Sequence, residues 1–192
     1  MLSHLSKYQI ILASQSPRRQ QLLGEIVEEF ECIVKPVDEV YSSALKREEI
    51  AIYLSQIKSE GFGALQDKQL VITADTIVCL GDRVLEKPKS KEQAIEMLTT
   101  LCGKTHTVYT GVTVRDLNHK VSFYDATDVT FKLMEQAEIE FYIEKCKPFD
   151  KAGSYGIQEW WGYVAIEKME GEFYNVMGLP LHKLFQVLKT WN

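Results

Sequence analysis

Two serines and two arginines stand together where an apolar run ends, in the stretch ILASQSPRRQQLL. Ser16 and Pro17 have the form of a helix start, with serine as N-cap and proline at the first helical position. A helix N-terminus offers unpaired N–H groups and the positive end of the helix dipole to an anion. Ser14 adds a hydroxyl group, and Arg18 and Arg19 add charges suited to bidentate phosphate contacts. The stretch therefore favours a phosphate-binding loop over a capped helix with solvated arginines.

A second chemical signal is the carboxylate of Asp75, which interrupts the apolar stretch LVITADTIVCL. A charge buried without a partner is very costly, so this side chain must meet a cation, a metal or a hydrogen-bond network, or have a raised pKa. Both a structural ion pair and a catalytic base or metal ligand satisfy that requirement. Glu39, Lys58 and Lys87 are candidate partners, and they gain a role only if the fold brings them to Asp75.

Composition limits the classes of ligand. The chain has 192 residues, 45% of them hydrophobic and 26% charged, with a net charge of −5. This balance is typical of a globular protein and argues against nucleic acid or an anionic membrane as a partner, so any anion must be met by a local basic cluster. The four cysteines are scattered without a C-x-x-C pair, and the first residues lack the pattern of a signal peptide. We expect a cytoplasmic protein with reduced thiols and no membrane segment.

The elements that must position these side chains can be predicted from apolar spacing and turn residues. Strands are expected over 9–13, 30–34, 70–80, 105–115 and 121–132, with two more around 169–172. Helices are expected from 16, over 47–64, 90–101 and 135–145, and from the GLP stretch to 188. Strands and helices alternate with antiparallel segments mixed in, which predicts an α/β fold with a mixed sheet. No linker marks a domain boundary, so the length fits one domain or two closely packed lobes.

Two further features are weaker. The glycine-punctuated loop KAGSYGIQ, residues 151–158, has the donors and acceptors to hold a polar ring such as a nucleobase, although most such loops are only turns. Trp160 and Trp161 would point to opposite sides of a strand, so core packing with one exposed ring is the simpler interpretation. The four histidines show no metal-ligand spacing, which favours surface or packing roles.

Five motifs occur in the order and rough spacing of the Maf proteins: LASQSPRR, ADTIV, LEKP, DKAGSYGIQ and GLPL. Maf proteins are nucleoside triphosphate pyrophosphatases, also called septum formation inhibitors, and the resemblance runs from about Ile10 to Leu188. It implies a single domain over residues 1–192 with a fold like that of the inosine triphosphate pyrophosphatases. Such a fold has an elongated mixed sheet, flanking helices and an active-site cleft between two lobes. It also implies hydrolysis to a monophosphate and pyrophosphate with a divalent metal, Mg²⁺ or Mn²⁺, and makes a homodimer plausible.

The resemblance also assigns roles to residues. Asp75 matches the proton acceptor of the family, and Glu39 matches an acidic cleft position that would share the metal with it. The positions matching the phosphate-binding loop and the basic cleft residues are Ser14, Ser16, Arg18, Arg19, Lys58 and Lys87. One departure is Thr73, which stands where many members have glycine, and it is compatible with a strand.

Three positions divide the family by substrate. The branch that resembles dTTP/UTP pyrophosphatases carries Arg, Thr and Gln, and here these are Arg19, Thr76 and Gln158. The branch acting on 7-methyl-GTP has a tryptophan in the SPxR motif and a glutamine after the aspartate, and neither is present. The resemblance therefore predicts a pyrophosphatase for dTTP and UTP or their modified forms. The alternatives are a pyrophosphatase for another nucleotide, such as 7-methyl-GTP, and a nucleotide-binding regulator of septum formation.

Overall fold

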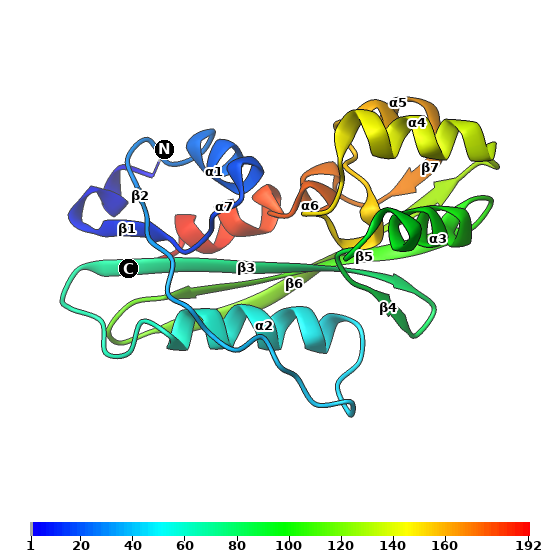
Figure 1. Cartoon of the computed structure of the whole chain (residues 1–192). Helices are drawn as coiled ribbons and strands as arrows, with labels where there is room; N and C mark the ends of the chain where they lie inside the picture. Colours follow the sequence, from blue (N-terminus) through cyan, green and yellow to red (C-terminus); the bar gives the residue numbers. More distant parts are fainter. Residues whose placement is uncertain (1) are drawn as a thin grey trace.

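A single mixed sheet of seven strands forms the centre of the protein, in a computed structural model that describes residues 2–192 (Figure 1). The strands are β1 (Gln9–Leu12), β2 (Glu31–Cys32), β3 (Gln69–Leu80), β4 (Arg83–Leu85), β5 (Thr105–Arg115), β6 (Lys120–Phe131) and β7 (Ile166–Glu170). Their order is β2-β1-β3-β5-β6-β7, with β4 beside β3. β1 runs parallel to β2 and β3, and the other pairs are antiparallel, which confirms the predicted α/β class with a mixed sheet.

Helices cover both faces of this sheet (Figure 1). They are α1 (Pro17–Gly24), α2 (Glu48–Glu60), α3 (Lys91–Leu101), α4 (Gln136–Cys146), α5 (Trp160–Val164), α6 (Phe173–Met177) and α7 (Leu181–Lys189), with short 3-10 helices η1 (Ser3–Lys7) and η2 (Ala152–Ser154). α2 lies along one face, and the other α-helices lie on the opposite face. No helix within residues 2–192 is long and apolar enough to cross a bilayer.

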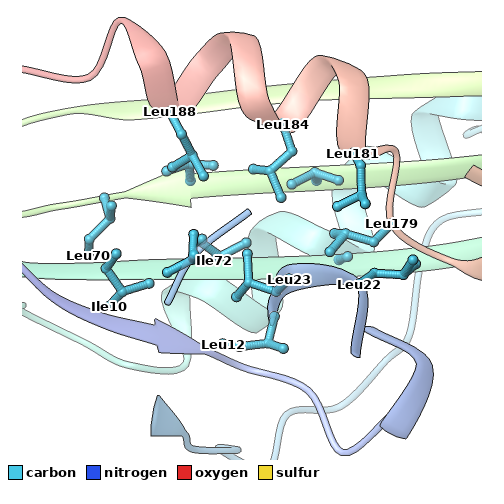
Figure 2. Packing of buried hydrophobic residues seen from close by; sticks show 14 of the residues in the cluster. Ile10, Leu12, Leu22, Leu23, Leu70, Ile72, Leu179, Leu181, Leu184 and Leu188 are labelled. Carbon is cyan, nitrogen blue, oxygen red and sulfur yellow. The ribbon is translucent and has the colours of Figure 1, made fainter. Parts of the chain in front are cut away.

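The helix-rich face holds two separate hydrophobic clusters. In the first, α1 and α7 pack on β1 and on the first half of β3, with Leu23, Ile72 and Leu184 at its centre (Figure 2). In the second, α3, α4 and α5 pack around Val78 of β3 and Trp161. Because β3 and β5 are long enough to run through both clusters, the sheet joins two lobes built on one face.

The polar interruption of β3 lies between these clusters. On one edge of β3, β1 pairs as far as Ile72 and β4 pairs from Val78. Between these two stretches, over residues 73–77, β3 is paired only with β5, on its opposite edge. Among residues 2–192, no strand pairs with residues 73–77 on the edge that β1 and β4 share. Side chains of this interval can therefore be approached from the gap between β1 and β4.

Three expected elements differ from the structure. The strand expected over 30–34 is reduced to the two residues of β2. The second strand expected after Gly171 is wrong, because α6 forms there, with the side chain of Asn175 buried against β5 and β6. Trp160 and Trp161 lie on the short helix α5 rather than on a strand, yet Trp161 is buried and packs in the second cluster.

Candidate active site

A cavity opens between the two clusters, at the interrupted edge of β3. It brings together eight of the ten predicted site residues, which come from α1 and its N-cap, α2, β3 and two loops. These eight are Ser16, Arg18, Arg19, Lys58, Asp75, Thr76, Lys87 and Gln158. The predicted residues Ser14 and Glu39 do not line the cavity, but each contacts a residue that does.

The turn into α1 is built as the sequence predicts. The Ser16 side chain accepts a hydrogen bond from the backbone N–H of Arg19, at 3.5 Å, and Pro17 is the first helical residue. Ser14 is buried, and its hydroxyl oxygen accepts the backbone N–H of Ser16 at 3.2 Å. Arg18 reaches the opposite lobe, where it donates to the carboxylate of Asp150 at 3.1 Å. This turn therefore presents one arginine to the mouth of the cavity.

The guanidinium of Arg19 is hydrogen-bonded to two groups outside its own helix. Its Nε donates to the backbone oxygen of Gly178 at 2.7 Å, and its Nη2 donates to Oγ1 of Thr76 at 2.9 Å. Burial lowers the pKa of the Arg19 guanidinium, and the negative charge of Asp75 acts in the opposite direction. A Cβ at Gly178 would lie 3.3 Å from Nε of Arg19, and its φ of 109° also favours glycine. The remaining donors of the guanidinium are left for a ligand.

The carboxylate of Asp75 is paired with a cationic side chain, that of Lys58. The ammonium group of this lysine also contacts Oε2 of Glu39 at 3.0 Å. The side chains of Asp75 and Lys58 are 13% and 17% exposed, whereas Glu39 is half exposed. Thr73 supports this geometry, because its hydroxyl donates to the backbone oxygen of Ser55 at 2.6 Å and so fastens α2 to β3. The sequence-based expectation of a partner for Asp75 is confirmed.

The two carboxylates suit a divalent cation. Glu39 and Asp75 both contact Lys58, so their oxygens converge on one cationic position. Mg²⁺ prefers hard oxygen ligands and is usually held by one or two carboxylates together with substrate phosphates. The donor set therefore fits a hard divalent cation of the kind that substrate phosphates also bind.

Two further charged residues line the cavity, Asp150 and Lys151, and neither was predicted from the sequence. Lys151 is buried, with its ammonium group 2.7 Å from Asp150 and 3.0 Å from Glu159. Burial alone would raise the pKa of Asp150, but hydrogen bonds from Lys151 and Arg18 outweigh it and lower that pKa. Asp150 thus joins Lys151 to Arg18 across the cavity. The available signal was their position at the start of the glycine-punctuated loop.

That loop also supplies uncharged groups. The side-chain oxygen of Gln158 is buried and has no hydrogen-bond partner among the described residues. Tyr155 is buried in the wall, and Lys87 is exposed at the rim. The cavity therefore combines a basic mouth with a free amide acceptor.

Known structures resemble this fold. A structure of a HAM1 protein from Coxiella burnetii matches with a TM-score of 0.52 over 96% of this chain and 100% of that one, at 13% sequence identity. At that identity the match shows the fold, which is the inosine triphosphate pyrophosphatase-like architecture that the motifs implied.

Other proteins are much more similar to this chain in sequence than this solved structure is. A protein named dTTP/UTP pyrophosphatase from Porphyromonas gingivalis is 47% identical over 100% of this chain and 98% of its own length. Proteins of the same name from Bacteroides thetaiotaomicron and Cytophaga hutchinsonii are 46% and 49% identical over 98% of this chain, and over 99% and 86% of their own lengths. The sequence pattern of the Maf-like proteins matches residues 9–191. This chain therefore belongs to the Maf-like protein family.

Proposed function

We propose that the protein hydrolyses dTTP and UTP to the monophosphate and pyrophosphate. Relatives that cover nearly the whole chain carry the name dTTP/UTP pyrophosphatase. The observation that carries the proposal is the cavity itself, which Arg18, Arg19, Lys58 and Lys87 line together with the largely buried carboxylate of Asp75. A polyanionic substrate requires such a basic cluster in a protein whose net charge is −5.

Different residues of the cavity have different roles in the hydrolysis of the phosphoanhydride. Attack of water on the α-phosphorus increases the negative charge on the leaving pyrophosphate, so positioning and charge neutralisation dominate. Arg18 and Lys87, which line the cavity, would hold the β- and γ-phosphates. Asp75, oriented by Lys58, accepts the proton of the attacking water. A divalent cation held by Glu39 and Asp75 would neutralise phosphate charge when bound.

Three residues at the inner end support selection of a pyrimidine. Arg19, Thr76 and Gln158 all line the cavity. Thymine and uracil present an imide N–H between two carbonyl oxygens. Arg19 offers donors to such oxygens, and the N–H has two neighbouring acceptors, Thr76 and the unpaired side-chain oxygen of Gln158.

The experiment is pyrophosphate release from a nucleotide panel, with and without Mg²⁺, by wild type and the Asp75→Asn variant. We expect dTTP and UTP to be preferred and Asp75→Asn to lower kcat by about 10²–10⁴. Asp82→Asn is the matched control, because Asp82 pairs with Arg47 on the surface, away from the cavity. Equal rates for wild type and Asp75→Asn would overturn the role of Asp75. A wild type that prefers 7-methyl-GTP would overturn the choice of pyrimidines.

Three expectations accompany this function. We infer a cytoplasmic enzyme that acts on small nucleotides without a nucleic-acid or membrane partner, and a homodimer. The alternative of a regulator of septum formation stays a prediction, and overexpression of Asp75→Asn separates it from catalysis. If septation is inhibited as strongly as by wild type, regulation does not depend on turnover.

A further inference from the structure

One buried hydroxyl behind the cavity has no role in the proposed chemistry. On the inner face of β5, Val108, Val112 and Val114 are buried, and Thr110 interrupts them with its side chain fully buried. Val108 belongs to the second cluster and the other two valines to the first, so Thr110 lies at the boundary between them. A valine would continue the apolar face, so the hydroxyl needs a separate explanation.

Thr110 belongs to a closed ring of hydrogen bonds behind Arg19. It lies directly opposite Thr76 in the β3–β5 register, and their hydroxyl oxygens are 2.9 Å apart. Its hydroxyl donates to the backbone oxygen of Asn175 at 2.9 Å, and that oxygen also accepts the N–H of Gly178 at 3.0 Å. The oxygen of Gly178 accepts Nε of Arg19, whose Nη2 donates to Thr76 and closes the ring.

The direction of each hydrogen in this ring is fixed. A backbone oxygen can only accept, so the single hydroxyl hydrogen of Thr110 points to Asn175. The contact between the two threonines then requires Thr76 to donate to Thr110. Thr76 also accepts a hydrogen from Arg19, so its one hydrogen and one of its two lone pairs are in use. Only an acceptor lone pair of Thr76 is left for a ligand.

We propose that Thr110 is a positioning residue that makes Thr76 an obligatory hydrogen-bond acceptor and thereby selects a ligand group bearing N–H. This inference rests on the proposed function. The imide N–H of thymine and uracil satisfies the acceptor, whereas the corresponding ring nitrogen of cytosine carries no hydrogen and is itself an acceptor. Two acceptors facing each other are unfavourable, so an acceptor that faces the ring-nitrogen position discriminates against cytosine.

A purely structural role makes a different prediction. If Thr110 only fastens α6 to β5, its loss lowers stability and slows all substrates alike. If it orients Thr76, its loss frees the Thr76 hydroxyl to donate, and the preference between bases changes. The ratio of kcat/KM for dTTP to that for dCTP therefore separates the two roles.

The test compares this ratio in wild type, Thr110→Val, Thr110→Ser and Thr113→Val. We expect Thr110→Val to lower the ratio about tenfold, the effect of one hydrogen bond, and Thr110→Ser to restore it. Thr113→Val is the matched control, since Thr113 is a buried threonine of β5 bonded to Ser55 and Ser122 on the α2 side, and its ratio should stay unchanged. If Thr110→Val does not fold, Thr110→Cys replaces it, because a thiol is a weak donor and acceptor.

A double-mutant cycle completes the test. Adding Thr110→Val to Thr76→Val should leave the ratio of Thr76→Val unchanged, because the residue through which Thr110 acts is already lost. An unchanged ratio in Thr110→Val, or additive effects in the cycle, would overturn the inference while leaving the proposed function intact. A wild type inactive on both nucleotides would overturn the proposed function and the inference with it.

Discussion

At the scale of single residues, His106 shows how burial fixes the protonation state of a side chain that does not itself line the cavity. The side chain is 1% exposed, and Nε2 lies 2.8 Å from the hydroxyl oxygen of Tyr155. The rings of Phe131 and Tyr155 meet the imidazole edge-on, with centroids 4.7 and 5.4 Å away. Burial lowers the pKa of His106 from 6.5 to about 4. The packing role expected for the histidines is realised here.

This shift makes stability depend on pH. Between pH 6.5 and 4 the unfolded chain binds a proton at His106 and the folded chain does not, so the free energy of unfolding falls as the pH is lowered through this range. The loss from this one group is on the order of 3 kcal/mol. Urea unfolding at several pH values should show that His106→Gln removes this part of the decline. His119→Gln, at an exposed position, is the control, and an unchanged slope in His106→Gln would contradict the assignment.

The site residues differ in how far the sequence could predict them. Asp75 was predictable because a charge inside an apolar strand demands a partner, and Ser16 because capping is local. Asp150 and Lys151 were not, because their importance comes from contacts with Arg18 and Glu159 that only the tertiary fold creates. The hydroxyl of Thr110 gave an even weaker signal, since threonine is common in strands.

At the scale of elements, the approach of α2 to the sheet decides where Lys58 lies. Gly111 faces Asp75 in the β3–β5 register. A Cβ at Gly111 would lie 2.3 Å from the backbone carbonyl carbon and oxygen of Ala51 and 2.5 Å from the nitrogen of Ile52. Since backbone atoms cannot swing aside, the helix can pack this closely only because residue 111 is glycine.

Gly111→Ala should therefore push α2 off the sheet. We expect a loss of stability of about 1–3 kcal/mol, as for other overpacked sites, and a fall in kcat as Lys58 moves relative to Asp75. Gly24→Ala in the last turn of α1 is the control, since its nearest neighbour is a side-chain atom of Phe30 at 4.0 Å. Thermal unfolding and steady-state kinetics measure both effects. Normal stability and activity of Gly111→Ala would show that α2 is free to shift.

The elements themselves were largely predictable from spacing and caps. Ser90 caps α3, for which a helix was expected over 90–101, and β3 and β5 have their predicted lengths to within one residue. α6 was not predictable, because five residues after a glycine carry little periodicity and the buried amide of Asn175 decides their conformation. That amide donates to the backbone oxygen of Val108 and to the hydroxyl of Thr127.

At the scale of the whole molecule, we propose that the two lobes form one cooperative domain. The lobes have separate hydrophobic clusters, but β3 and β5 pass through both. Neither cluster can lose these strands without exposing part of the other. The ion pair of Arg18 and Asp150 adds a contact across the cavity mouth. A ligand in the cavity would therefore bind to a frame already held together by the sheet.

Tryptophans in each lobe allow a test of this cooperativity. Trp191 belongs to the first cluster and Trp161 to the second, so variants that keep only one of the three tryptophans, either Trp191 or Trp161, report each lobe by fluorescence. Leu184→Ala opens a cavity in the first cluster and should lower the free energy of unfolding by about 2–5 kcal/mol. In one cooperative domain both probes shift by the same amount, because the second cluster unfolds with the first. Leu98→Ala in the second cluster is the reciprocal control. If only Trp191 responded to Leu184→Ala, and only Trp161 to Leu98→Ala, the lobes would be independent units and the cleft a junction between domains.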